Sequence, residues 1–414
     1  MPWITAPGPR IAWPDALARV AGARSLICLH TADGDTLVAV EPEVRALPGW
    51  DEVAALAGTP DAPQPALPTA PGWHAHGPGW AVRFDYEFPA RAGVGWRLDA
   101  YARWSATGCT LHAGDAAGIA RLAAAFAGPA QACPPPTLAT PLVPAWDAGG
   151  HRSRVERILA WIAAGDIYQA NLTLPVSGRL APSPHPDVGL FLALAAQSPA
   201  PYAALLRAPG QPAVISNSPE CFLRQRGPQL WSEPIKGTRR RIVGAEATTR
   251  DELLSSAKDR AELAMIVDLV RNDLGRVALP GSVRVDAAAA VMDLPYVHHL
   301  VARVSAQLRP KASFVDTLRA AFPAGSITGA PKLRAMQIIA ELEAGPRGAY
   351  CGAFGWIGAD HADLAVAIRT VTIADDAVRL HAGGGIVADS DGAAEWEEVR
   401  AKAAAMAAAL GGAL

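Results

Sequence analysis

The chain has 414 residues, half of them apolar and only 18% charged, which excludes a small disulfide-stapled module and extensive disorder. The 37 Lys and Arg nearly balance the 39 Asp and Glu, and a formal net charge of −2 gives no indication of nucleic acid or an anionic membrane as partner. We find neither the ~18 consecutive apolar residues of a membrane span nor the basic and apolar regions of a secretion signal, so we expect no membrane association.

The five cysteines are odd in number, widely scattered and free of any CxxC pair. This pattern argues against a disulfide framework and against a structural zinc site. We therefore expect a protein of the reducing cytoplasm.

The first part of the chain is rich in Pro, Gly and Ala, and its clearest strand patterns lie at 25–30, 36–40 and 80–86. The proline-rich run at 133–144 then predicts a semi-rigid linker. We place a boundary near residue 140, which divides the chain into regions 1–140 and 141–414.

The second part opens with an amphipathic helix followed by a strand. The i, i+3, i+4, i+7 spacing of apolar residues is carried by Val155, Ile158, Leu159 and Ile162, and Gly165 would end this helix. Over 166–174 the pattern changes to period two, with Tyr168 on the face of Ala170, Leu172 and Leu174 and with Gln169, Asn171 and Thr173 on the other. A polar strand face next to a buried helix indicates a wet cavity.

Further patterns predict helices at about 259–273, 316–322, 332–344 and 393–409 and strands at about 213–216, 364–372 and 378–383. Two of these helices carry acids on one face. Asp259 and Glu262 are spaced i, i+3, and Glu395, Glu398 and Lys402 are spaced i, i+3, i+7. If the two faces meet they form a site for a hard cation such as Mg²⁺, and otherwise they are ordinary solvated helix faces.

Two glycine-containing segments could bind anions through backbone N–H groups. Gly383–Gly385 follows a predicted strand, although a plain tight turn is the simpler reading. The segment GSITGAPK at 325–332 resembles a phosphate-binding loop but lacks the Lys directly after the second Gly, so nucleotide binding is not supported. It remains a loop that opens a helix, where an anion could bind.

Four further residue types could carry chemistry. Lys236 lies in an apolar turn before three arginines, where burial and nearby cations would lower its pKa and make it a nucleophile, or it is a surface lysine. Glu220 follows a strand, and the histidine pair ends in His299; either could act as acid or base, or be a satisfied core residue. Arg369 lies in an otherwise apolar predicted strand, where a guanidinium requires an anionic partner.

The order of these segments is more specific than any one of them. In sequence they read GDIYQANLT (165–173), SPE (218–220), PIKGTR (234–239), KDRAELAMIVDLVRNDLGRV (258–277), HHL (298–300), GSITGAPK (325–332), RGAYCGAFGWIG (347–358), AIRT (367–370) and GGGIVADSDGAAEWEEVRAK (383–402). The series, over about residues 145–404, resembles the chorismate-utilising enzymes, which include anthranilate, aminodeoxychorismate, isochorismate and salicylate synthases. The resemblance implies an α+β fold of two large, mostly antiparallel sheets in a sandwich with helices outside. Residues 1–140 would be the family's variable N-terminal region and 141–414 its chorismate-binding catalytic domain.

The resemblance also implies a role for each matching residue. Glu262 and Glu398 would bind Mg²⁺, with Asp259 and Glu395 as nearby acids, and the metal would bind the ring carboxylate of chorismate. Arg369 and Tyr350 would hold the enolpyruvyl carboxylate. The rest of the anion pocket would be formed by Thr238, Gly383, Gly385 and Lys402.

Three residues would carry the chemistry, and a fourth narrows the reaction. By resemblance, Glu220 protonates the leaving C4 hydroxyl, His299 lies close to the ring, and Lys236 attacks C2. Lys236 in PIKGT is similar to the aminodeoxychorismate synthases, since anthranilate synthases typically have Ala there. Gln169 occupies the position where the water-using members have a lysine base, and an amide cannot serve as that base. We therefore expect amination of chorismate at C4 for 4-aminobenzoate and folate.

Ammonia is expected from a separate glutamine amidotransferase subunit, because the chain has no recognisable glutaminase nucleophile and Cys221 stands where relatives often carry Arg. From the length of the sequence we also expect no fused aminodeoxychorismate lyase. The N-terminal part lacks an LLES-type tryptophan-binding signature. Two alternatives stay open: an anthranilate synthase component I, and a non-catalytic chorismate-binding subunit.

Overall fold

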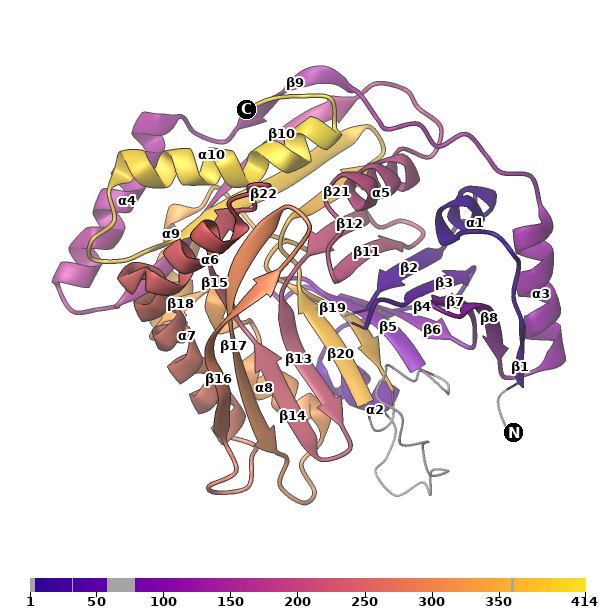
Figure 1. Cartoon of the computed structure of the whole chain (residues 1–414), viewed down its shortest axis with the longest axis horizontal. Coiled ribbons are helices and arrows are strands. Elements are labelled where there is room, and N and C mark those ends of the chain that lie inside the picture. The colour runs from indigo at the N-terminus through magenta and orange to yellow at the C-terminus, as the bar shows by residue number, and fades with distance from the viewer. Residues whose placement is uncertain (1–3, 32, 58–78, 359–360) are drawn as a thin grey trace.

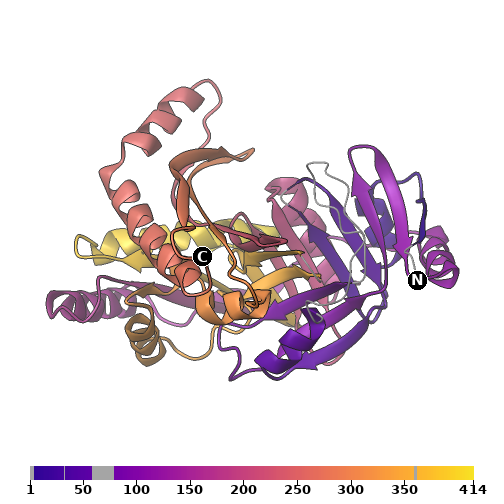
Figure 2. The same cartoon turned by 90° about the horizontal axis from the view of Figure 1, so that it is seen from below.

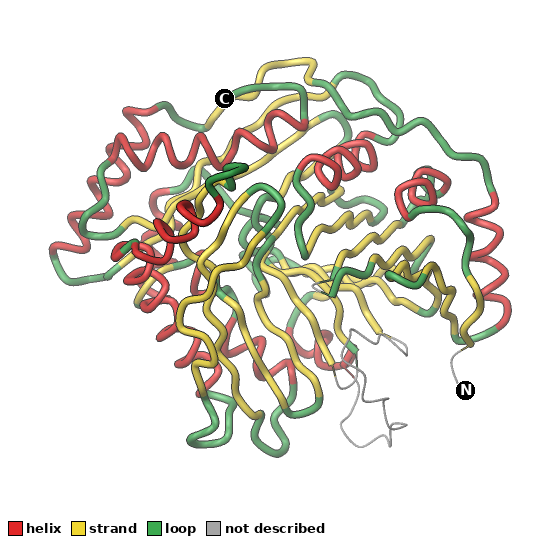
Figure 3. The backbone as a smooth tube through the Cα atoms, in the orientation of Figure 1, coloured by secondary structure: helices red, strands yellow, loops and turns green. Residues whose placement is uncertain are grey.

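The computed structural model describes residues 4–31, 33–57, 79–358 and 361–414, and its strands form two large sheets at the centre with helices around them (Figures 1 and 3). Strand pairing between neighbours is antiparallel throughout the described segments. The predicted α+β class with two antiparallel sheets and outer helices is therefore confirmed.

The first sheet has 12 strands. In spatial order they are β1 (Ile4–Pro7), β8 (Gly108–Ala113), β7 (Ala100–Ser105), β3 (Thr36–Val40), β2 (Leu26–His30), β11 (Tyr202–Arg207), β12 (Ala213–Ser218), β21 (Thr370–Ala374), β22 (Ala377–Ile386), β10 (Gln169–Leu180) and β18 (Gly329–Ala330), with β9 (Leu138–Pro144) also paired to β10. The β22–β10–β18 end of this sheet carries the glycine run and the predicted polar strand.

The second sheet has 10 strands. In spatial order they are β15 (Ile235–Arg240), β17 (Val297–Gln307), β14 (Gln229–Glu233), β13 (Cys221–Arg226), β20 (His361–Val366), β19 (Ala353–Ile357), β5 (Gly79–Phe84), β6 (Gly93–Leu98) and β4 (Glu43–Leu47), with β16 (Arg284–Asp293) also paired to β17. The strand with Lys236, β15, lies at one end of this order.

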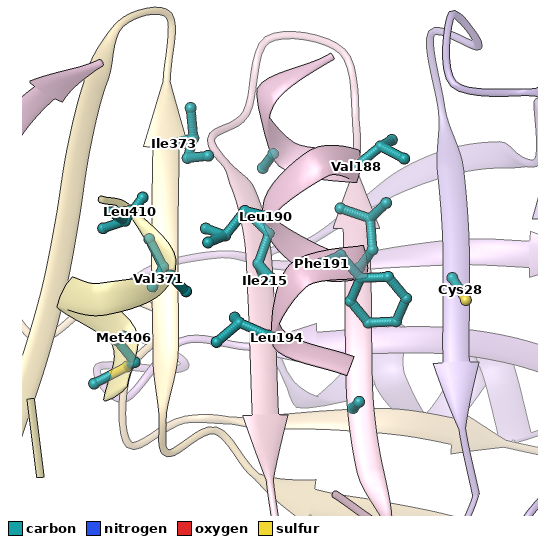
Figure 4. Close-up of a cluster of buried hydrophobic side chains, with 14 of the residues drawn as sticks. Cys28, Val188, Leu190, Phe191, Leu194, Ile215, Val371, Ile373, Met406 and Leu410 are labelled. Carbon is teal, nitrogen blue, oxygen red and sulfur yellow. The ribbon is translucent and has the colours of Figure 1, made fainter. Parts of the chain in front are cut away.

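The helices cover the outer faces of the sheets. They are α1 (Trp13–Arg19), α2 (Trp50–Ala57), α3 (Ala116–Ala127), α4 (Ala148–Ala163), α5 (Pro186–Gln197), α6 (Glu246–Ser255), α7 (Ala257–Gly275), α8 (Phe314–Ala321), α9 (Lys332–Leu342) and α10 (Gly392–Ala409), with a short 3₁₀ turn at Gly325–Ile327. Side chains of α1, α3, α5 and α10 share one core with the first sheet, and Figure 4 shows α5 within it. A second core joins α7 and α8 to the second sheet, and a third joins α4 and α9 to β10.

The central strands of the first sheet are buried on both faces, as β2 illustrates. Leu26 and Cys28 join the core beneath the outer helices, whereas Ile27 and Leu29 join the core that also contains Trp96 of the second sheet. A strand buried on both faces gains from apolar residues at every position, which explains its unbroken apolar run.

The periodic helices are confirmed with small differences at their ends. The helix predicted from Val155 to Ile162 is α4, capped by the Asp147 side chain, which accepts from Gly150 N. Gly165 follows it with φ +82°, a left-handed conformation that favours glycine and ends the helix. The two helices that carry acids are α7 and α10, each with a capping side chain, from Ser256 and Asp391 respectively.

Three sequence-based expectations are wrong in detail. The strand predicted over 364–372 is two strands, β20 in the second sheet and β21 in the first, and Arg369 lies between them with φ +51° rather than inside a strand. Part of the proline-rich run is β9, because a strand paired on one side only tolerates prolines that cannot donate to a neighbour. Tyr168 precedes β10 and is 68% exposed, so it does not share the buried face of Ala170.

Both sheets contain strands from either side of residue 140, so neither sheet belongs to one of the two predicted regions alone. The division into a variable region 1–140 and a catalytic domain 141–414 stays a prediction. Figure 2 shows the N-terminal residues, in indigo and purple, gathered at one end of the molecule. Within the described ranges, none of the helices has the length and apolar content needed to cross a bilayer.

Candidate active site

The candidate site lies where β15 of the second sheet faces β22 and β10 of the first (Figure 1). A Cβ added at Gly385 of β22 would lie 2.3 Å from Gln169 Nε2 and 3.4 Å from Lys236 Nζ. The amide of Gln169 and the amine of Lys236 therefore lie over the same glycine. Three segments far apart in sequence meet at this point, as the family resemblance implied.

Lys236 is the amine at the centre of the site. Its Nζ donates to the backbone oxygen of Ser326 at 3.3 Å. Burial lowers the pKa of Lys236, Lys402 lowers it further, and the carboxylates of Glu262 and Glu220 oppose this. A lysine with a lowered pKa has a larger neutral fraction at a given pH, and the neutral amine is the nucleophilic form.

Glu220 is a buried carboxylic acid in the short turn between β12 and β13. Burial raises its pKa to about 7, although Ser326 and Lys236 both favour the ionised form and oppose the rise. Its backbone N–H donates to Ser218 Oγ at 3.2 Å, which fixes the turn. At neutral pH a large fraction of this acid therefore holds a proton that it can donate.

His299, Thr238 and Arg369 form a second group. His299 Nδ1 lies 2.9 Å from Thr238 Oγ1, and Arg369 Nη2 lies 3.0 Å from His299 Nε2. A guanidinium has only donors, so Nε2 must accept and the proton must lie on Nδ1. Burial, followed by the Arg369 charge, lowers the pKa of His299 to about 3. The ring is thus held as one neutral tautomer.

The predicted acids occupy one region, but most have protein partners. Asp259 pairs with Arg239 at 2.8 Å, Glu395 accepts from Ser390 Oγ at 2.7 Å, and Glu398 pairs with Lys402 at 2.6 Å. Glu262 makes no hydrogen bond or ion pair with the described residues. Burial raises the pKa of the Glu262 carboxyl, and the negative charges of Asp259 and Glu398 add to this rise. The face of α7 with Glu262 therefore lies near the face of α10 with Glu398, which is one of the two arrangements that the sequence left open.

Within the described ranges, no three His, Cys, Asp or Glu side chains are close enough to bind a metal ion by themselves. Mg²⁺ is commonly bound by one or two carboxylates, with water and substrate oxygens as the other ligands. Glu262 makes no ion pair within the described residues, although the charges of Lys236 and Lys258 favour its ionised form, and it lies near Glu398. This pair has the carboxylate oxygens that a magnesium ion with water and substrate ligands would need. Glu398 would have to exchange Lys402 for the metal.

The glycine run lets side chains approach β22 from both sides. Lys402 Nζ donates to Gly383 O at 2.9 Å, and a Cβ at Gly384 would lie 3.1 Å from Glu395 Oε2. At Gly385, on the opposite side of the strand, a Cβ would meet Gln169. The run is the last part of a strand rather than a tight turn.

Two further predicted residues are buried near this strand. Gln169 is fully buried, and neither its Oε1 nor its Nε2 has a hydrogen-bond partner in the described chain. A buried amide without partners is costly unless a ligand or water satisfies it, which supports substrate contact. The Tyr350 ring stacks on the ring of His381, and the two ring centroids are 5.0 Å apart. His381 stands two residues before Gly383 in β22, so Tyr350 packs against the strand that carries the glycine run.

The sequence did not single out Ser326 or the buried ion pair between Arg347 and Glu343. The pair is joined by Arg347 Nη2 to Glu343 Oε1 at 2.7 Å and Nε to Oε2 at 2.9 Å. Lys332, expected in an anion-binding loop, instead pairs with Asp273 at 2.7 Å. The segments that contain these residues, RGAYCG and GSITGAPK, were recognised in the sequence. No local pattern indicated which residues Arg347 and Ser326 would contact.

Comparison with known proteins identifies the class to which this site belongs. The model of the chorismate binding enzyme family matches residues 100–408, and the chain belongs to that family. Among solved structures, the menaquinone-specific isochorismate synthase from Escherichia coli has a TM-score of 0.81 at 22% identity, covering 99% of this chain and 94% of that one. Anthranilate synthase component I from Streptococcus pneumoniae has a TM-score of 0.75 at 23% identity, covering 98% and 92%. These likenesses show the chorismate-utilising fold.

Curated relatives are more similar in sequence. Aminodeoxychorismate synthase component 1 of Klebsiella aerogenes is 44% identical over 264 residues, which are 62% of this chain and 58% of the relative. Anthranilate synthase component 1 of Streptomyces coelicolor is 45% identical over 260 residues, 62% of this chain and 50% of the relative. The chain thus spans roughly half the length of the curated relatives it matches, and two activities are represented at nearly equal identity.

Proposed function

We propose that the chain is the chorismate-aminating subunit of an aminodeoxychorismate synthase. It would replace the C4 hydroxyl of chorismate with an amino group from ammonia, giving 4-amino-4-deoxychorismate for 4-aminobenzoate and folate. Overall identity does not separate this activity from anthranilate synthesis, so the proposal depends on the site. The observation that carries it is Lys236, an amine of lowered pKa placed beside Gln169 and near the raised-pKa acid Glu220.

The proposed reaction uses these groups in two displacements. Glu220 gives its proton to the C4 hydroxyl, which leaves as water, while Lys236 Nζ forms a bond to C2 and both conjugated double bonds of the ring shift along C2, C1, C6, C5 and C4. Ammonia then bonds to C4, both double bonds shift back, and the bond from C2 to Nζ breaks. The proton that the added ammonia loses returns to Glu220. The raised pKa of Glu220 and the lowered pKa of Lys236 favour the protonated acid and the neutral amine that the first step needs.

Chorismate is a dianion, and the site offers a partner for each carboxylate. Arg369 and Tyr350 would hold the enolpyruvyl carboxylate. Glu262 and Glu398 would hold Mg²⁺ against the ring carboxylate, where the metal would withdraw electron density from the ring. Thr238, Gly383, Gly385 and Lys402 would line the remaining pocket, with His299 next to the ring.

We further propose that ammonia comes from a separate glutamine amidotransferase subunit, as the name component 1 of the relatives implies. The chain's cysteines support this indirectly. Burial raises the pKa of the Cys28, Cys221 and Cys351 thiols, which makes them poor nucleophiles. All five thiols are free, which suits a reducing cytoplasm.

The test is a reaction with chorismate, Mg²⁺ and ammonium, with aminodeoxychorismate lyase added to release the final product. We expect 4-aminobenzoate, and none without the lyase. Formation of 2-aminobenzoate and pyruvate without the lyase would instead establish anthranilate synthesis. Binding of chorismate with no product from either route would establish a non-catalytic subunit.

Lys236→Ala tests the nucleophile. Because the first displacement needs the amine, we expect amination to fall by at least about 10²-fold. The control is Lys311→Ala, an exposed lysine in the turn between β17 and α8, which should keep full activity. Unchanged 4-aminobenzoate formation by Lys236→Ala would refute the assignment. Chelation of Mg²⁺ should abolish product, and readdition should restore it.

A further inference from the structure

His299 has a hydrogen-bond partner at each of its two ring nitrogens. Nδ1 lies 2.9 Å from Thr238 Oγ1 and 3.4 Å from the backbone oxygen of Gly237, and Nε2 lies 3.0 Å from Arg369 Nη2. A backbone oxygen can only accept and a guanidinium can only donate, so both contacts place the ring proton on Nδ1. The whole residue is 2% exposed. The Nδ1 proton and the Nε2 lone pair are therefore both occupied by neighbouring residues, which leaves neither for exchange with a substrate.

Arg369 is anchored through its backbone, whereas its guanidinium has one partner in the described part of the chain. The residue lies where the chain passes from β20 to β21, and its backbone oxygen accepts from Asn217 N at 3.0 Å. Within the described residues the guanidinium makes no ion pair, and its one hydrogen bond goes to His299 Nε2. A guanidinium has five N–H donors, so four remain for a ligand. A partly buried cation without a protein anion is suited to hold a carboxylate, and His299 is the side chain that sets its direction.

We propose that His299 is a positioning residue, a neutral acceptor that aims the Arg369 guanidinium at the substrate carboxylate, and that it is not an acid or base of the reaction. The inference rests on the proposed function, in which Arg369 holds the enolpyruvyl carboxylate of chorismate. Strand pairing supports this chain of contacts, because Thr238 of β15 lies directly opposite His299 of β17. Thr238 and Gly237 fix the rotation of the ring through Nδ1, and the ring fixes one edge of the guanidinium through Nε2. Burial lowers the pKa of His299 to about 3, so at neutral pH no proton competes with Arg369 for Nε2.

The first experiment measures the dissociation constant of chorismate by calorimetry, with Mg²⁺ present and ammonium absent. His299→Leu removes the acceptor for Arg369, and we expect chorismate to bind at least about tenfold more weakly, because hydrogen bonds to charged groups are among the stronger ones. His299→Gln is the conservative variant, since its side-chain oxygen can accept from Arg369 in place of Nε2. It should recover most of the affinity that His299→Leu loses.

An Arg369→Met background tests whether His299 acts through the guanidinium. Arg369→Met alone should weaken binding, and adding His299→Leu should weaken it no further, because two residues that act through one contact are not additive. His298→Leu is the matched control. The neighbouring His298 is 1% exposed and its Nδ1 lies 2.6 Å from Asp293 Oδ1, so its loss removes a buried histidine contact without removing the acceptor of Arg369. Its affinity for chorismate should stay within about twofold of wild type.

The second experiment measures kcat in the amination assay, where a positioning residue differs from an acid or base. Loss of a catalytic acid or base costs about 10²- to 10⁴-fold in rate. For His299→Gln, whose amide does not exchange protons in this way near neutral pH, we expect a fall in kcat of less than about tenfold.

Three results would overturn the inference: a fall in kcat of about 10²-fold or more in His299→Gln, no recovery of affinity by glutamine, or an additional loss from His299→Leu in the Arg369→Met background. All three leave the identity of the product, and with it the proposed function, as it was. Formation of 2-aminobenzoate by the wild-type protein would refute that function whatever the His299 variants do.

Discussion

The buried ion pair between Arg347 and Glu343 offers a sharp test of how the interior near the site is held together. Their side chains are 1% and 3% exposed. Arg347 also donates to Ile327 O at 2.8 Å and to Asn171 O at 2.6 Å. Glu343 in turn accepts from Thr173 N and Oγ1, both at 2.9 Å. The pair therefore joins the end of α9 to β10 and to the turn that carries Ser326.

Arg347→Met removes the cation but keeps much of the volume. The Glu343 carboxylate then stays buried with only the two Thr173 donors, and two backbone carbonyls lose theirs. Leaving one partner of a buried pair unpaired costs about 3–5 kcal/mol. We expect a loss of that size in the free energy of unfolding at pH 7, measured by urea titration with tryptophan fluorescence.

The double variant Arg347→Met, Glu343→Leu separates charge from packing. It removes the unpaired carboxylate but leaves the Thr173 N–H unsatisfied, at about 1–3 kcal/mol, in addition to the two backbone carbonyls that lose their donor in both variants. It should therefore be more stable than Arg347→Met alone. The control Arg157→Met breaks an exposed pair with Glu341, whose side chains are each 51% exposed, and should cost less than about 1 kcal/mol. A double variant no more stable than the single one would refute this reasoning.

Two further outcomes follow from the geometry and the buried titratable groups. Gly385→Ala places a Cβ 2.3 Å from Gln169 Nε2, so we expect kcat/KM for chorismate to fall about tenfold or more. Gly275→Ala, with no atom within 4 Å of the added Cβ, is its control, and equal kinetics of the two would contradict the steric account. Acidification should destabilise the fold because four histidines, the buried His151, His299 and His381 and the partly buried His30, have pKa values lowered to between about 3 and about 4. They stay neutral when folded but bind protons near pH 6.5 when unfolded, so stability is present above pH 6.5 and is lost as pH falls towards 4, by up to about 1.4 kcal/mol per histidine per pH unit. Glu220 and Asp363, with pKa values raised to about 7, partly offset the loss, and an unfolding free energy that rises from pH 6.5 to 5 would contradict the prediction.

The local features of this fold could be predicted from sequence because their causes are local. The apolar spacing around Val155 depends only on residues within one helix, and α4 follows it. Arg369 shows where prediction from local pattern fails. Its segment is apolar on both sides and resembles one strand, yet the chain leaves one sheet and enters the other at this residue. Which sheet each half joins depends on strands β12 and β13, over a hundred residues away, so no local pattern contains the answer.

The same distinction separates the site residues that could be found from those that could not. Lys236, Glu220 and Gln169 stand in segments whose order along the chain matches the family, and the structure places them near one another. Ser326 lies in a segment that was noticed, but as a loop that could bind an anion. Its contact with Lys236 spans 90 positions of sequence and depends on how the 3₁₀ turn meets β15. Such a contact can be predicted only when the register of both sheets and the conformation of the turn are known together.

The near-zero net charge of the chain likewise conceals an arrangement that only the fold explains. On one side of β22, α10 brings Glu395 within 3.1 Å of where a Cβ of Gly384 would be; on the other, Lys236 and Gln169 lie over Gly385. Glu395 and Lys236 thus approach one strand from opposite sides, and side chains at positions 384 and 385 would keep them away from its backbone. Glycine in a strand interior normally weakens it, because it gives up side-chain packing. In β22 this loss of packing is confined to the end of a strand whose first part is paired on both sides. At that end the absence of side chains lets Glu395, Lys236 and Gln169 approach the backbone closely.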